Sequence, residues 1–204
     1  MSTIIGLVGV IGSGKTFQRD LLISKGFTPI DFKDALIDMC EDLVGFPIRG
    51  EYESFKSHII GFNKIELSPN VKIRNLQDYS DSCLETYPLA MTGRKLLQRL
   101  GTEVMRKRDP EYWTNAWAKS ATSTLNNGHG VVAADVRFPN EIKAIRGLAW
   151  TVGADCRIIF CDYKSPRYDA TSKHESEVMA QALLQQGYQD LQEIKADAWV
   201  EGVF

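Results

Sequence analysis

The sequence predicts an α/β fold in which helices cover a central, mainly parallel sheet. Short apolar runs of strand length alternate along the chain with longer segments of helical periodicity. A glycine-rich loop joins the first apolar run to the first helical segment, as in a strand–loop–helix unit. The length of 204 residues and the 44% hydrophobic content suit one globular domain over residues 1–204.

The first strand is expected over residues 4–8, followed by the glycine loop and a helix over 16–24 that Gly26 ends. A short strand over 28–32 completes a β-α-β pattern, and residues 35–44 form the next helical segment. A helix between two strands returns the chain to the same end of the sheet, so these strands are expected to be parallel.

The middle of the chain is less regular. Over 46–92 the pattern loosens into polar, aromatic and proline-containing stretches, which we interpret as an insertion, partly helical, over the functional site. Residues 94–106 predict an amphipathic helix whose inward side chains are Leu96, Leu97, Leu100 and Val104. Residues 109–111 supply a cap, a first-turn proline and an acidic first turn for a helix that carries Trp113 and Trp117.

The C-terminal part returns to the strand and helix alternation. A buried strand over 131–134 ends at Asp135, a helix is expected over 139–147, and a further strand over 156–161. The stretch "SKHE" at 172–175 has capping-box spacing ahead of another helical segment. The C-terminal tail fits either a strand or the end of a helix.

Composition excludes several classes of partner. A formal net charge of −2 gives no electrostatic attraction to long nucleic acid or to an anionic membrane. No window approaches the roughly 20 apolar residues of a membrane span, and the N-terminus lacks the basic region of a signal peptide. The four cysteines contain no Cys-x-x-Cys pair and are read as reduced, partly buried thiols. We expect a soluble, cytoplasmic protein, and a homodimer stays open.

The glycine loop matches G-x-x-x-x-G-K-[ST] at Gly9, Gly14, Lys15 and Thr16, with Gly12 as an additional glycine. Backbone N–H groups of such a P-loop, together with the following helix N-terminus, bind the phosphates of ATP. The alternative, a glycine-rich strand end with an exposed lysine, is disfavoured by the flanking strand and helix. A dinucleotide fingerprint is excluded because no third glycine follows in register. The predicted ATP-binding residues are Ile11, Gly12, Ser13, Gly14, Lys15 and Thr16.

A P-loop site also needs a carboxylate at the end of a neighbouring strand. Asp135 has this position, so Thr16 and Asp135 are the predicted Mg²⁺ ligands, although a strand-end cap is an equal alternative for the aspartate. Arg137 lies two residues further, where strand alternation places it on the same side of the chain. Lys15 is expected to stabilise the charge of the β and γ phosphates.

The acceptor decides which reaction follows. A phosphate acceptor needs positioning and charge neutralisation rather than a base, and therefore arginines. Arg94 and Gln98 lie at i and i+4 of the predicted helix and can address one ligand, while Gly101 lets a ligand or a neighbouring element approach closely. For Arg94 a solvated helix face is an equal alternative. The polar segment 162–174 is a predicted lid, with Arg167 as its first-choice cation.

Five ordered blocks of the chain together resemble the bacteriophage-type deoxynucleoside monophosphate kinases. They are "GVIGSGK", "DFKDAL", "GRKLLQRLGTEVMRKRDPEYW", "DVRFPNE" and "HESE", which span roughly residues 4–180. The insertion and the tail match poorly. The resemblance implies a Mg²⁺-dependent transfer of the γ-phosphoryl of ATP to a deoxynucleoside 5′-monophosphate, giving a deoxynucleoside diphosphate and ADP.

The resemblance also implies roles for individual residues. Arg94, Gly101 and Trp113 would contribute to the nucleotide acceptor site, although core packing is an alternative for Trp113. Three further residues, Asp135, Arg137 and Glu141, would face the same cleft. Asp34 matches an acidic position on the acceptor side, but the lysine that often follows three residues later in the family is Ile37 here.

Two other functions stay open on the sequence alone. The first is a small-metabolite P-loop kinase that resembles dephospho-coenzyme A kinases, with a hydroxyl acceptor and Asp34 as its base. The second is a P-loop nucleotide switch that is not a kinase; it would leave Arg94 and Arg137 unexplained.

Overall fold

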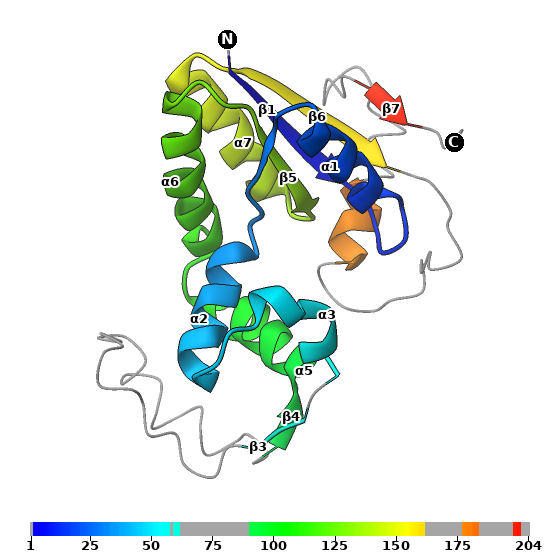
Figure 1. Ribbon diagram of the computed structural model, residues 1–204, viewed down its shortest axis with the longest axis vertical. Helices are drawn as coiled ribbons and strands as arrows, with labels where there is room; N and C mark the ends of the chain where they lie inside the picture. The colour runs from blue at the N-terminus through cyan, green and yellow to red at the C-terminus, as the bar shows by residue number, and fades with distance from the viewer. Residues whose placement is uncertain (1, 58, 62–89, 162–176, 184–197, 201–204) are drawn as a thin grey trace. The chain divides into compact units, whose positions relative to one another are not determined.

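The computed structural model describes residues 2–57, 59–61, 90–161, 177–183 and 198–200 (Figure 1). The chain divides into two compact units, of which the first comprises Met1–Asp34 and Glu111–Phe204 and the second comprises Ala35–Pro110. Within the described ranges, no helix combines the length and the apolar character that a bilayer-spanning segment requires.

The first unit is built on a five-stranded sheet in the order β2-β5-β1-β6-β7. Every strand pair in it is parallel, with β1 (Thr3–Val8) between β5 (Val131–Val136) and β6 (Asp155–Cys161). The edge strands are β2 (Thr28–Pro29) and β7 (Ala198–Val200), so the tail forms a strand. The predicted α/β fold with a central parallel sheet covered by helices is confirmed.

The strand order of the sheet reverses at β1. β5 and β2 lie on one side of β1, whereas β6 and β7 lie on the other. In parallel α/β sheets, ligands bind outside the carboxyl ends of the strands at the point where the strand order reverses. The glycine loop leaves the carboxyl end of β1 at this point.

Alternate residues of the central strands pack into two separate apolar clusters. Ile4 and Val8 of β1 pack with α6 (Tyr112–Asn126) and α7 (Pro139–Val152), whereas Ile5 and Leu7 pack on the opposite face, with Leu22 of α1 (Lys15–Ser24). Figure 1 shows α6 and α7 on one face of the sheet and α1 on the other. Both faces of the sheet are therefore covered, as a parallel sheet requires.

Several element boundaries of the first unit differ from the prediction, and those of α7, α6 and β2 are the most informative. The α7 helix continues past Gly147 to Val152 and ends where Gly153 adopts a φ of 67°. A helical glycine costs only about 1 kcal/mol, and the added turn buries Ala149 in the core. The α6 helix begins at Tyr112, after a turn at 110–111 rather than directly after Asp109. The β2 strand ends at Pro29, because side-chain carboxylates bind the backbone that follows Ile30.

The second unit contains α2 (Asp34–Val44), which begins at the boundary, followed by a 3₁₀ turn η1 (Arg49–Glu51) and α3 (Tyr52–Phe55). An antiparallel pair, β3 (Ile59–Gly61) and β4 (Ala90–Thr92), precedes α5 (Gly93–Gln98) and η3 (Arg99–Arg106). The unit has its own apolar cluster, formed by Ile37, Cys40, Ile48, Phe55, Leu96, Leu97 and Leu100. Of the predicted insertion 46–92, residues 58 and 62–89 lie outside the described residues.

The predicted helix over 94–106 changes its pitch half-way. Its first part, α5, is an α-helix, whereas η3 is a π-helix. Leu96, Leu97 and Leu100 are buried as predicted, but Val104 is only half-buried and Met105 packs on the apolar cluster instead. A π-helix repeats its contacts at i and i+5, which is the spacing of Leu100 and Met105.

Candidate phosphate-binding site

The loop between β1 and α1 has the backbone that its glycines predict. Gly12 and Gly14 have φ angles of 79° and 84°, in the left-handed region that favours glycine. Gly9 is required for a different reason, because a Cβ there would lie 2.6 Å from the carbonyl oxygen of Cys161 and 2.2 Å from Ser13 Oγ. The loop is therefore closely packed against the end of β6.

Lys15 folds back over this loop. Its Nζ donates to the carbonyl oxygens of Gly9 at 2.5 Å and Val10 at 2.6 Å. Burial first and the Arg137 guanidinium second lower the pKa of Lys15, which is about 8 after the opposing effects of Glu177, Cys161 and Asp135. Bound phosphates would reverse this shift, since they supply negative charge to a desolvated ammonium group.

The start of α1 is open to a ligand. Thr16, in its first turn, is exposed, as is Ile11 in the loop. The N-cap of this helix is Gly14, which has no side chain to cap the first turn. A helix N-terminus that follows a glycine loop binds phosphate through its first N–H groups and the helix dipole.

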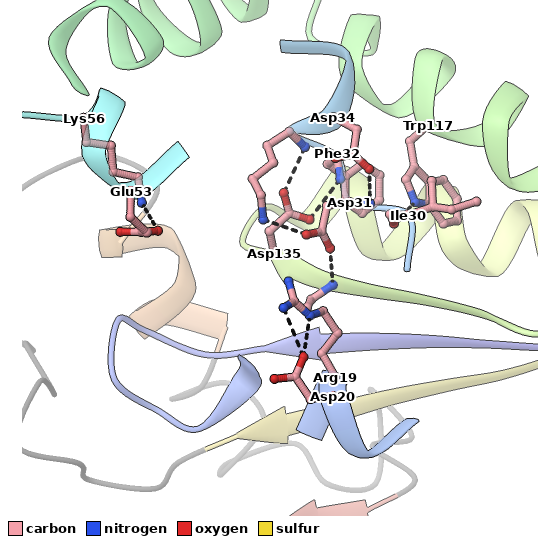
Figure 2. Close-up of polar contacts among 12 residues, drawn as sticks. Arg19, Asp20, Ile30, Asp31, Phe32, Asp34, Glu53, Lys56, Trp117 and Asp135 are labelled. Atoms are coloured by element: carbon pink, nitrogen blue, oxygen red, sulfur yellow. Dashed lines mark hydrogen bonds and ion pairs between the residues drawn. The ribbon is translucent and has the colours of Figure 1, made fainter. Parts of the chain in front are cut away.

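Asp135, the predicted second magnesium ligand, holds the chain that follows β2 (Figure 2). Its carboxylate accepts the backbone N–H groups of Phe32 and Lys33, both at 2.9 Å. Burial raises the pKa of Asp135 well above its ordinary value, and the neighbouring Asp31 carboxylate raises it further. The capping role that the sequence left open for this aspartate is thus present.

Asp31 belongs to the same acidic group, and the sequence analysis missed it. The residue is 6% exposed, and its carboxylate accepts the N–H of Ala134 at 2.7 Å and pairs with Lys33 Nζ at 2.6 Å. Asp34 in turn accepts the N–H of Asp31 at 2.8 Å at the start of α2 (Figure 2). Two aspartates at i and i+3 after a strand signalled this turn, but the contact with β5 has no local signature.

Arg137 follows β5 and is linked to the glycine loop by Glu177, which contacts both. Its Nη1 lies 2.5 Å from Glu177 Oε1, and Glu177 Oε2 accepts the N–H of Ile11 at 3.0 Å. Glu177 is 2% exposed and is the first described residue of a helix over 177–183. It is the last residue of the "HESE" block, which the pattern of residues 172–175 placed at the start of a helix.

Glu141 has a structural role. Its Oε2 accepts the N–H groups of Arg137 at 2.7 Å and Phe138 at 3.0 Å, and the residue is 2% exposed. It therefore caps the N-terminus of α7, where Pro139 occupies the first turn. This capping role orients the Arg137 backbone, and the expectation that Glu141 faces a substrate cleft stays a prediction.

The tryptophans of α6 are both buried. Trp117 stacks on Phe32 with ring centroids 4.7 Å apart and donates from Nε1 to the carbonyl oxygen of Ile30 at 2.9 Å. Trp113 is 3% exposed and lies edge-to-face against Tyr112. Core packing, the alternative considered for Trp113, matches this burial.

The predicted acceptor residues of α5 and η3 belong to the second unit. Arg94 is exposed, and among the described residues its guanidinium has no ion pair; Gln98, one turn further, is half-buried. Gly101 is buried, and a Cβ there would lie 2.9 Å from Leu36 Cδ2, so a neighbouring helix makes the close approach. The predicted lid 162–174, with Arg167, lies outside the described residues.

The residues described here contain no cluster of three or more His, Cys, Asp or Glu side chains that could hold a metal ion. A magnesium ion bound with ATP does not need such a cluster, because phosphates and water fill most of its octahedral positions. The exposed Thr16 hydroxyl in the first turn of α1 fits one of those positions, with the acidic group of Asp31 and Asp135 at a neighbouring strand end.

Comparison with known proteins adds only distant likenesses. A scan against protein-family models found no match, and a search of curated proteins found none. Among 14 matching chains of solved structures is a mutant of the APS kinase CysC from Mycobacterium tuberculosis, at 15% identity and a TM-score of 0.33 over 90% of this chain and 96% of that one. The same kinase in complex with AMPPNP and APS matches at 14% identity and 0.34, with equal coverage. At these values the likenesses carry no weight for activity.

Proposed function

We propose that this protein transfers the γ-phosphoryl group of ATP to a deoxynucleoside 5′-monophosphate. The observation that carries the proposal is the glycine loop at the centre of a parallel sheet, with Lys15 folded over it and the open N-terminus of α1 beside it. This arrangement suits a nucleoside triphosphate. Arg137 adds a second cation next to the loop, which suits a transfer reaction in which negative charge gathers between two phosphates.

Each residue has a distinct role in this proposal. The loop N–H groups of residues 12–16 bind the phosphates, and Lys15 leaves its carbonyl acceptors to contact the β and γ phosphates. Arg137 stabilises the transferring group. Thr16 would hold Mg²⁺, and Asp135 would accept hydrogen bonds from the ion's waters; the ion would supply charge neutralisation between the phosphates.

The acceptor side rests on Arg94 and on the resemblance to deoxynucleoside monophosphate kinases. An exposed guanidinium without an ion pair among the described residues suits a phosphate monoester, which arginine binds with two parallel hydrogen bonds. Gln98 lies one turn further on the same helix and supports the same ligand. Arg167 remains the proposed cation of the lid.

The proposal is tested by following ADP formation from MgATP over deoxy- and ribonucleoside monophosphates. A deoxynucleoside monophosphate should stimulate ADP release strongly. Arg94→Ala should raise the KM for that acceptor about 10- to 100-fold, the loss expected for a charged hydrogen bond, and leave the KM for ATP unchanged. Lys95→Ala is the matched control, because Lys95 is an exposed cation on the same helix. Stimulation by no monophosphate would refute the proposal.

One observation favours a second candidate, a kinase with a hydroxyl acceptor. The raised pKa of Asp135 brings this carboxyl group closer to the range of a general base, which a hydroxyl acceptor needs and a phosphate acceptor does not. Adding small hydroxylated metabolites and APS to the same assay separates the two candidates. ATP hydrolysis without stimulation by any acceptor would instead indicate a nucleotide switch.

A further inference from the structure

Glu177 joins two parts of the candidate site that are distant in sequence. One carboxylate oxygen accepts the N–H of Ile11 in the glycine loop at 3.0 Å, and the other lies 2.5 Å from Nη1 of Arg137. The side chain is 3% exposed, compared with 30% for Arg137. The carboxylate is therefore enclosed between the loop and the arginine.

A buried carboxylate is unexpected at a place that should receive phosphates. Desolvation of a charge is costly unless hydrogen bonds and an opposite charge compensate for it, and a carboxylate repels incoming phosphate. One oxygen of Glu177 accepts a backbone N–H, and the other lies in an ion pair with the guanidinium but has no hydrogen-bond partner among the described residues. This arrangement sets the position of the arginine relative to the loop, because both contacts start from one planar group.

Glu177 interacts electrostatically with two cations of the candidate site, Lys15 and Arg137. Lys15 and Arg137 are close enough for the guanidinium to lower the pKa of the lysine, whereas Glu177 raises it. Without Glu177, two cations beside one loop would repel each other. With it, they remain together before any phosphate is bound.

We propose that Glu177 is a positioning residue, which holds the Arg137 guanidinium beside the glycine loop and fixes the first half of that loop for the incoming triphosphate. The kinetic part of this inference rests on the proposed phosphoryl transfer. The part that concerns the loop does not, since it is tested by ATP binding alone. A competing role, in which the carboxylate occupies the space of a phosphate, predicts the opposite sign for ATP affinity.

Two variants separate the two contacts. Glu177→Gln keeps an oxygen that accepts the Ile11 N–H but removes the charge that holds Arg137. It should lower kcat about 10- to 100-fold, the loss expected when a contact between opposite charges is broken, and change the Kd for ATP by less than about threefold. Glu177→Ala removes both contacts and should also weaken ATP binding by about tenfold. Asp20→Asn, which breaks the exposed Arg19–Asp20 pair on α1, is the matched control and should change neither quantity.

A double-mutant cycle with Arg137→Ala tests whether Glu177 acts through the arginine. Arg137→Ala leaves a buried carboxylate without its ion pair and should lower the Tm. Adding Glu177→Gln should restore part of the Tm while kcat stays at the level of Arg137→Ala. A structural role unrelated to the arginine would lower kcat equally in both backgrounds.

Three results would overturn the proposal. The first is a full Glu177→Gln effect on kcat in the Arg137→Ala background, and the second is tighter ATP binding by Glu177→Gln, which would show a competing anion. The third is unchanged ATP affinity in a folded Glu177→Ala protein. If the wild-type protein binds ATP but phosphorylates no acceptor, the proposed function fails by itself, and the ATP affinities of Glu177→Ala and Asp20→Asn still decide whether Glu177 positions the loop.

Discussion

Lys15 should take up a proton when ATP binds, by an amount that depends on pH. In the free protein its pKa is lowered to about 8, chiefly by burial and then by Arg137. Phosphates around the ammonium group should raise this pKa above its ordinary value, so the bound lysine is fully protonated at pH 9 and below. The uptake per bound ATP is therefore about 0.1 proton at pH 7, about 0.5 at pH 8 and about 0.9 at pH 9.

The same linkage sets the pH dependence of affinity. A lysine that is neutral in the free protein must be protonated before it contacts phosphate. Above pH 8 the Kd for ATP should consequently rise, approaching tenfold per pH unit. Below pH 7 the lysine is already protonated, and this group should no longer affect the Kd.

Calorimetric titration with MgATP, in buffers that differ in ionisation enthalpy, measures the number of protons directly. The experiment uses MgATP because its phosphates are fully ionised over this pH range. Lys15→Arg is the matched control, since arginine keeps the charge but does not titrate below pH 12. A proton uptake that is the same at pH 7 and pH 9, or the same in Lys15→Arg, would refute the assignment of Lys15 as a desolvated lysine that phosphate recharges.

Three further predictions concern packing and reactivity. Gly147→Ala should raise the free energy of unfolding by about 0.5–1 kcal/mol, because this helical glycine has open space around its Cβ position. Gly153→Ala, at a φ of 67°, should lower the free energy of unfolding. Chemical denaturation measures both, and a loss of stability in Gly147→Ala would contradict a continuous α7. Gly9→Ala should abolish detectable ATP binding in calorimetry, because the added Cβ would meet the Cys161 carbonyl oxygen at 2.6 Å; wild-type affinity would show that the loop packs otherwise. Burial raises the pKa of the Cys40 thiol to about 12, so iodoacetamide at pH 8 should alkylate the half-buried Cys156 before Cys40; mass spectrometry that finds Cys40 modified earlier than Cys156 would contradict its burial.

The glycine loop could be predicted because its information is local. The spacing of Gly9, Gly14 and Lys15 is part of one short stretch, and the apolar run before it and the helical run after it are adjacent in sequence. The two left-handed φ angles at Gly12 and Gly14 follow from the same residues. The parallel sheet was predictable for a related reason, because the alternation of strand and helix lengths repeats along the chain.

The contacts of the acids could not be predicted, because they join distant parts of the chain. Glu177 is 166 positions from Ile11, and Asp135 is 103 positions from Phe32. The sequence placed Asp135 correctly at a strand end, yet the backbone N–H groups that it binds lie in the turn after a different strand, β2. No periodicity reports such a contact, and only burial of the carboxylates in the folded chain reveals it.

The pitch of the helix over 94–106 shows a second limit. The spacing of Leu96, Leu97 and Leu100 is that of an α-helix, and the same template places Val104 inward. The chain instead continues as a π-helix, and Met105 takes that place in the apolar cluster. Apolar spacing identifies the buried face of a helix, but a single turn leaves i+4 and i+5 undecided when both residues are apolar.

Transfer of the γ-phosphoryl group to another phosphate is the central claim, and labelled ATP tests it most directly. Purified protein is incubated with Mg²⁺, ATP labelled in its γ-phosphoryl group and a deoxynucleoside monophosphate, and the products are separated by thin-layer chromatography. The account predicts that the label appears in a deoxynucleoside diphosphate and that Lys15→Ala abolishes this product. Label found only in inorganic phosphate, or an equal yield of labelled diphosphate from Lys15→Ala, would contradict it.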